Sequence, residues 1–290
     1  MRSFADHNPI ATAVYFLAAA GVAMFSMDPV ILAISLTGAL ICCGVLQVMH
    51  GLRSHLYTLG LFLLMTLINP LVSHRGATVL FVMKHNPVTL EALLYGAAAA
   101  GMIVSVLYWF RSFTHMMTSD KLLYLFGALS PKLSLILSMT LRYVPLFHQQ
   151  VRKVQQSQQA LGLYKEDNIV DRFRGGLRIF SVMVTWALEN GIVTADSMTA
   201  RGYGIGRRSR FSLFRWTLSD TLLLTASLLL GALTLMGLAG NSAAYYPRFL
   251  LPAMSARLLT GYAAYTLLVL LPAMIQGKEA LRWHCLTSRM

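Results

Sequence analysis

The run LSDTLLLTASLLLGALTLMGL occupies Leu218–Leu238 and is long and apolar enough to cross a lipid bilayer as one helix. Its only charged residue is Asp220, close to the start. Further apolar runs of similar length lie at 10–27, 29–49, 56–72, 90–110 and 256–275. Because a helix satisfies its backbone hydrogen bonds within itself, we predict an all-α integral membrane protein with about six transmembrane helices.

The composition of the whole chain supports this class. Of the 290 residues, 56% are hydrophobic and only 12% are charged, and soluble domains rarely have such a composition. A secretory signal peptide is an alternative explanation of the first run, since Arg2 precedes it. A second run follows at once, however, and Asp28-Pro29 predicts a tight connection and not a cleavage site. We therefore expect the first span to stay in the mature protein.

Lysine and arginine are concentrated between the fourth and fifth apolar runs. Segment 142–215 holds 12 of the 24 basic residues. Cytoplasmic loops of membrane proteins carry an excess of these residues, so we predict that this segment is cytoplasmic. Counting spans outward from it places both termini inside and the loops 73–89 and 239–255 outside.

The net charge of +13 raises nucleic acid as a partner, because a basic patch marks many proteins that bind it. Membrane topology explains the charge more simply, since basic residues flank the spans and also meet anionic lipid head groups. The chain has no zinc-finger spacing and no glycine-rich phosphate loop. Its three cysteines show no C-x-x-C spacing and its eight histidines are scattered. We predict no nucleic-acid binding, no metal site and no cofactor.

The region between the fourth and fifth runs has a helical pattern of its own. Residues 122–139 are apolar but are interrupted by Ser130-Pro131-Lys132, so we predict two short helices at the membrane interface and no seventh span. From Leu141, apolar residues recur every three or four positions, which predicts a long amphipathic helix. A polar loop at 162–176 would join it to a second helix.

The second helix has an apolar stripe of its own over 177–198. Gly191 and Ala195 lie four residues apart on this stripe. Small residues at this spacing let helix backbones approach closely, so we expect this helix to cross another at short range there.

Both predicted helices end on a small-residue triplet. The two triplets are Ala160-Leu161-Gly162 and Ala200-Arg201-Gly202. Glycine often ends a helix because it adopts the left-handed conformation without steric cost, and a cation suits the negative end of the helix dipole. An ordinary helix stop explains either end alone, but the pairing predicts that two tips project together and dock a partner. An arginine there would pair with acidic groups in a pocket.

Other motifs extend along most of the chain. They include Asn69-Pro70, Glu91-Ala92-Leu93, Leu141-Arg142-Tyr143-Val144-Pro145, Gln159-Ala160-Leu161-Gly162 and Ala195-x-x-Met198-x-Ala200-Arg201-Gly202. In these motifs the chain resembles the transmembrane T component of energy-coupling factor (ECF) transporters, a family related to the permease subunit of cobalt uptake systems.

This resemblance implies a scaffold subunit of an ABC-type importer in a prokaryotic cell membrane, with no enzymatic activity of its own. The two triplets would end coupling helices that insert into grooves on two ABC-type ATPase subunits. A separate small membrane protein, the S component, would bind the vitamin or metal ion that is taken up. The family's triplet typically reads Ala-Arg-Gly; Arg201 fits it, whereas Leu161 stands where arginine is usual.

The expected organisation has membrane helices in 1–120, interfacial and coupling helices in 121–216, and the last two membrane helices with a tail in 217–290. One alternative is a membrane-embedded enzyme acting on anionic lipids or nucleotide-linked substrates. It would need catalytic groups, and the only acidic residue deep at a span boundary is Glu91.

A conventional ABC permease, which binds its solute itself, is the other alternative. The few polar residues within the spans, such as Gln47, Thr66 and Asn69, weigh mildly against it. The chain also lacks a G-x-x-x-x-G-K-S/T loop, so ATP would have to bind to other chains.

Overall fold

The computed structural model describes residues 4, 7–46, 52–73, 76–83, 86–163, 169–206, 214–240 and 243–287. These residues are helical apart from one small hairpin and irregular connections. The packing divides the chain into two compact units. The first combines Met1–Leu122 with Phe214–Met290, and the second is Leu123–Leu213.

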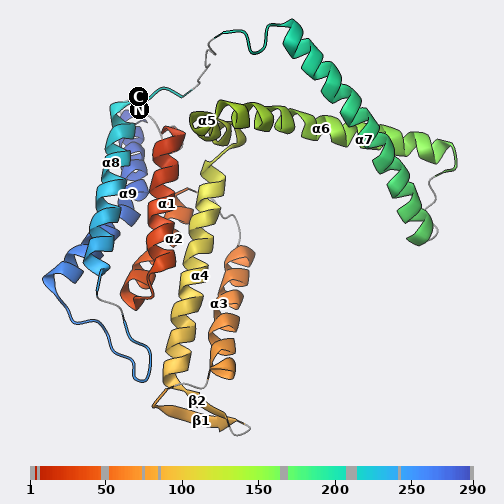
Figure 1. Cartoon of the computed structure of the whole chain (residues 1–290). Coiled ribbons are helices and arrows are strands. Elements are labelled where there is room, and N and C mark those ends of the chain that lie inside the picture. Colours follow the sequence, from red (N-terminus) through yellow and green to blue (C-terminus); the bar gives the residue numbers. More distant parts are fainter. Residues whose placement is uncertain are drawn as a thin grey trace. The chain divides into compact units, whose positions relative to one another are not determined.

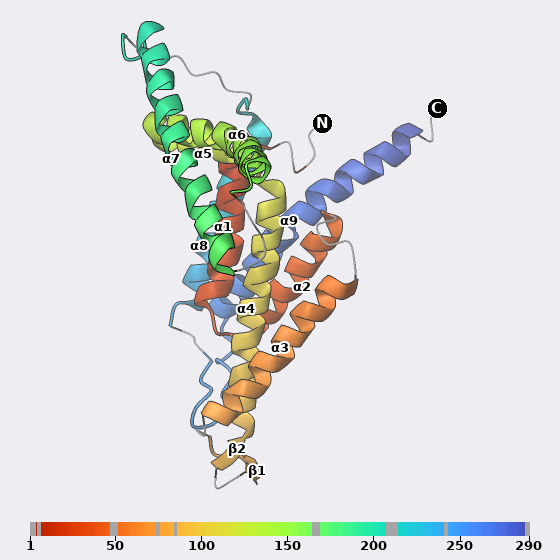
Figure 2. The same ribbon diagram turned by 90° about the vertical axis from the view of Figure 1, so that its right-hand side faces the viewer.

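The first unit is a bundle of six apolar helices, drawn in Figures 1 and 2. They are α1 (Pro9–Phe25), α2 (Pro29–Val45), α3 (Leu52–Val72), α4 (Leu90–Met116), α8 (Leu218–Leu238) and α9 (Ala256–Thr287). By length and composition, α3, α4, α8 and the first 23 residues of α9 could each cross a membrane, while α1 and α2 are shorter apolar helices of 17 residues. The predicted all-α membrane fold is confirmed, and each predicted span coincides with one of these helices.

Local sequence signals explain where several of these helices begin. Proline occupies the first position of α1 and α2, where no backbone donor is needed. The residue before each proline caps its helix with its side chain. Asn8 accepts the N–H of Ile10 at 3.1 Å, and Asp28 accepts the N–H of Val30 at 3.0 Å. The Asp28-Pro29 pair therefore makes the tight connection that the sequence predicts.

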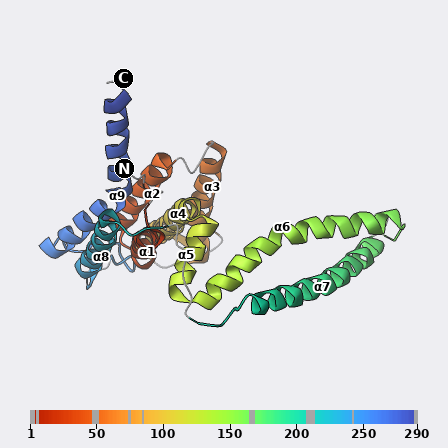
Figure 3. The same ribbon diagram turned by 90° about the horizontal axis from the view of Figure 1, so that it is seen from above.

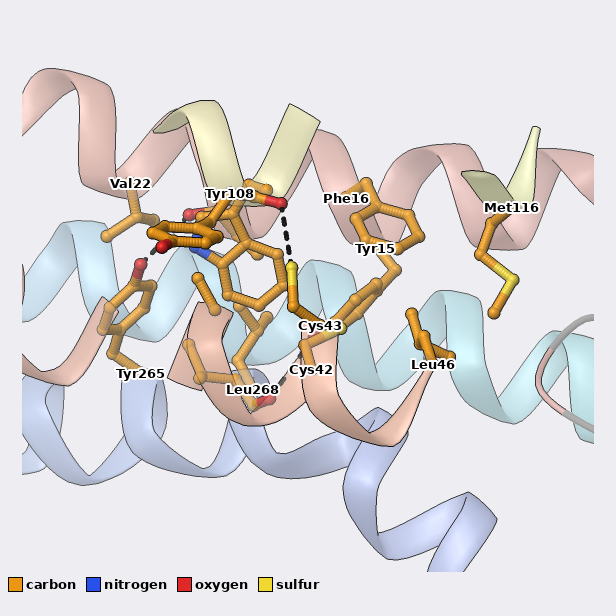
Figure 4. Close-up of a cluster of buried hydrophobic side chains, with 14 of the residues drawn as sticks. Tyr15, Phe16, Val22, Cys42, Cys43, Leu46, Tyr108, Met116, Tyr265 and Leu268 are labelled. Carbon is orange, nitrogen blue, oxygen red and sulfur yellow. Dashed lines mark hydrogen bonds between the residues drawn. The ribbon is translucent and has the colours of Figure 1, made fainter. Parts of the chain in front are cut away.

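The bundle core is aromatic at its centre. Trp109 of α4 is fully buried, and its ring packs edge-on against Tyr15 and Phe16 of α1 at 6.2 Å between centroids. Its indole Nε1 donates to Ser35 Oγ of α2 at 3.0 Å. Figure 4 shows the same cluster with Tyr265 of α9 directed into it. These contacts join α1, α2, α4 and α9.

One end of the bundle gathers the connections α1–α2, α3–α4 and α8–α9. The Tyr245 hydroxyl donates to the carbonyl of Met27 at 2.6 Å, and the Ala77 N–H donates to the carbonyl of Pro247 at 3.1 Å. Burial raises the pKa of Tyr245 to about 12, so its donating hydroxyl stays protonated further into the alkaline range than that of an ordinary tyrosine. The loops predicted to share one side of the membrane thus do lie together.

The chain between α3 and α4 forms a hairpin that the sequence analysis missed. It pairs β1 (Val79–Met83) with β2 (Asn86–Thr89) in antiparallel register. Just beyond it, the buried carboxylate of Glu91 accepts the Thr78 N–H, at 3.2 Å to each oxygen. Glu91 therefore holds the start of this hairpin against the start of α4.

The opposite end of the bundle is fastened by Asp220 at the start of α8. Its carboxylate is fully buried and lies 2.8 Å from His7 Nδ1. It also accepts the N–H of Asn8 at 3.0 Å, and the N–H and hydroxyl of Thr217 at 3.0 and 2.7 Å. The single charged residue of this span is therefore an anchor for the N-terminal segment.

The second unit contains most of α5 (Ser119–Leu129), with α6 (Pro131–Ala160) and α7 (Ile169–Ala200). The predicted break at Ser130-Pro131 separates α5 from α6. The prediction of two short helices is right for the first, α5. It is wrong for the second, which continues without a break into the long amphipathic helix as α6. Proline stands at the first position of α6, where it starts a helix. The predicted polar loop is also shorter, since α7 begins at Ile169.

The helices α6 and α7 form an antiparallel hairpin (Figure 3), and its two arms cross in the view of Figure 1. At the crossing, Tyr143 and Thr194 share a hydrogen bond of 2.8 Å, and the rings of Phe147 and Trp186 meet edge-on at 5.4 Å. Gly191 has no described atom within 4 Å of where a Cβ would lie. The predicted close crossing at Gly191 and Ala195 is therefore wrong for this helix pair, because bulky side chains on another face make the contact.

The apolar stripe predicted on the second helix lies at the surface of its unit. Four of its large side chains retain between 41% and 67% of their full exposure. They are Leu177, Phe180, Val184 and Leu188. Within the described residues, this stripe is left for lipid or for another protein to cover.

Candidate docking tips

The first tip is the C-terminal end of α6. Gly162 has a φ of +69°, in the left-handed region. This conformation lets the Gly162 N–H donate to the carbonyl of Gln159 and the Leu163 N–H donate to that of Gln158, both at 2.9 Å. Such a pair of bonds is the Schellman motif, which satisfies the last carbonyl groups of a helix.

The second tip, at the end of α7, repeats this geometry. Gly202 has a φ of +77°. Its N–H donates to the carbonyl of Thr199 at 2.9 Å, and the Tyr203 N–H donates to that of Met198 at 3.0 Å. The predicted left-handed glycine ends are therefore confirmed. Leu161 and Arg201 occupy the same position in the two motifs, directly before the glycine.

The predicted tip residues are accessible. Leu161 retains 72% of its full exposure, and Ala160, Gly162, Ala200 and Arg201 are also exposed, while Gly202 is half-buried. Among described residues, Arg201 forms no ion pair. A partner could therefore reach the end of each helix.

The two tips lie at opposite ends of the helix hairpin, as Figure 3 shows. A helix of 32 residues such as α7 is about 48 Å long. The chain between Gly162 and the start of α7 can span at most about 25 Å, so the tips are at least about 20 Å apart. The expectation that they project together is wrong, because each follows the C-terminal end of one arm of an antiparallel pair.

The surroundings of the tips differ. At the first, the guanidinium Nη1 of Arg178 on α7 donates to the carbonyl of Leu163 at 3.3 Å. At the second, the exposed Ile205 follows the motif and donates its N–H to the carbonyl of Gly202 at 3.1 Å. The sequence gives no reason to place Arg178 at a tip, since it lies 15 residues from Leu163 in the chain.

The region of the chain that is similar to known proteins includes both tips. A family model described as "Cobalt transport protein" (CbiQ) matches residues 2–213. The chain belongs to this family. The matched region includes α1 to α4 of the bundle and the whole α6–α7 hairpin, so the multi-pass helical architecture is that of a CbiQ-family membrane protein.

Several curated members of the ECF transporter class are also similar to the chain. An energy-coupling factor transporter transmembrane protein EcfT from Listeria innocua is 32% identical over 104 residues, which cover 35% of this chain and 39% of that protein. An EcfT from Streptococcus thermophilus is 30% identical over 113 residues, covering 38% of this chain and 43% of that protein. The chain thus matches about two fifths of the length of these relatives.

Proposed function

We propose that this chain is the T component of an ECF-type ABC importer in a prokaryotic cell membrane. In this role it couples ATP hydrolysis by two ATPase subunits to uptake of a vitamin or metal ion through a separate S component. The observation that carries the proposal is the repeated backbone geometry of the two exposed helix ends. Because the two helix ends share one backbone geometry, they suit two binding partners of the same kind, such as two ATPase subunits.

The distance between the tips supports docking on two separate subunits. Tips at least about 20 Å apart cannot enter a single small pocket. Arg201 presents a planar fork of donors with a permanent charge, which pairs well with carboxylates lining a groove. Each tip would then transmit the movement of one ATPase subunit along its helix.

The exposed apolar stripe of α7 supports a partner that is itself a membrane protein and reaches the cytoplasmic surface of the membrane. Leu177, Phe180, Val184 and Leu188 offer a continuous face that water would not favour. A small, apolar S component could cover it. The excess of basic residues in 142–215 supports a cytoplasmic location for the hairpin, with both termini on the same side.

The test is affinity purification of the full chain from its native membrane, with the wild type compared with Arg201→Glu. We expect ABC-type ATPases and a small apolar protein to purify with the wild type. The charge reversal should reduce ATPase recovery, because the tip would then repel an acidic groove. Arg152→Glu, at an exposed position on α6, is the matched control and should leave recovery unchanged. A wild-type chain that purifies alone would refute the proposal.

A further inference from the structure

The two tips share a shape but differ in charge. The residue before the glycine is Arg201 in the second tip and the neutral Leu161 in the first. With no charge at this position, the first tip would meet an acidic groove only through apolar side chains and backbone groups. Leu161 and Leu163 are 72% and 49% exposed.

The other arm of the hairpin brings a cation to the first tip. Arg178 lies on α7, and its Nη1 donates to the carbonyl of Leu163, the last residue of the Schellman motif. The N–H of Leu163 is bonded to α6, which places this residue beside the tip. The hydrogen bond therefore holds the guanidinium group 3.3 Å from Leu163, the residue that follows Gly162.

The guanidinium group of Arg178 keeps capacity for a partner. An arginine has five N–H donors, and the bond to Leu163 uses one of them. The side chain is exposed and forms no ion pair with any residue that the structure describes. It can still present a two-donor fork to a carboxylate.

We propose that Arg178 supplies at the first tip the positive charge that Arg201 supplies at the second, and that it binds an acidic side chain in the ATPase groove that receives Leu161 and Gly162. This inference rests on the proposed function. It assigns the first docking contact to both arms of the hairpin, whereas the second contact belongs to α7 alone. The first groove would need apolar surface for Leu161 beside its acidic group.

The test measures the affinity of the full-length chain in lipid nanodiscs for the ATPase subunits that purify with it. Arg178→Gln should weaken binding by about tenfold or more, since removing one member of a charged, hydrogen-bonded pair costs at least ~1.4 kcal/mol. Arg172→Gln is the control. This exposed arginine of the same helix points about 120° away from Arg178 and should bind within about twofold of the wild type.

The decisive variant combines Arg178→Gln with Leu161→Arg. It moves the charge to the position that carries it in the second tip, so we expect binding to return to near the wild-type level. Failure of this rescue, or an Arg178→Gln chain that binds normally while Arg201→Glu does not, would overturn the role of Arg178 and leave the proposed function intact. If Arg201→Glu also binds normally, the proposed function itself fails.

Discussion

The close approach of α8 and α9 yields a quantitative prediction. A Cβ added at Gly237 would lie 2.7 Å from the Cα of Gly261 and 2.9 Å from the carbonyl oxygen of Arg257. Both are backbone atoms, so neither can rotate away, and Gly237→Ala must push the helices apart. Overpacking of this kind costs about 1–3 kcal/mol. The better helix propensity of alanine offsets up to about 1 kcal/mol, so we expect a net loss of about 1–2 kcal/mol.

The measurement is thermal unfolding of the purified full chain in detergent. At about 2–4 °C per kcal/mol for a chain of this size, the midpoint for Gly237→Ala should fall by about 2–8 °C. Gly231→Ala is the matched control on α8, because its Cβ would meet the Cβ of Ala18 at an ordinary 3.6 Å. That variant should unfold at the wild-type temperature or slightly above. Equal midpoints for both variants would refute the close approach of the two backbones at Gly237.

Two further predictions concern helix ends. Asp220→Asn replaces a buried carboxylate by an amide that cannot accept hydrogen bonds from both Asn8 and Thr217. The unfolding midpoint should therefore fall by the equivalent of about 1–3 kcal/mol. Protease should also cut the N-terminal segment faster. An unchanged midpoint would contradict this. Gly202→Ala places a side chain in the left-handed region at a cost of about 1–2 kcal/mol and should weaken ATPase binding, whereas Gly191→Ala, in open space within α7, should not. Equal binding by the two variants would count against the tip geometry.

The membrane helices could be predicted because their signals are local. Length and apolarity identify a span, and a cap followed by proline marks where α1 and α2 begin. The left-handed glycines of the two tips were predictable for the same reason. Their conformation depends only on the residues of the last helical turn.

Features that depend on distant contacts could not be predicted. The β1–β2 hairpin has short strands, and it is held by contacts such as Glu91 with Thr78 and Pro247 with Ala77. Proline at 131 was compatible with either a broken helix or a new one, and only the structure shows that α6 continues through Leu141. Small residues at 191 and 195 permit a close crossing but do not choose which face of α7 meets α6.

At each of the two helix ends, the backbone path and the side chain before the glycine are determined independently. The backbone path at each tip is fixed by one glycine and two main-chain hydrogen bonds, none of which involves the side chain of Leu161 or Arg201. That side chain can therefore change without altering the outline that the partner receives. On the proposed function, a substitution at position 161 or 201 could change the affinity of one tip for its ATPase subunit without changing the backbone geometry of either tip.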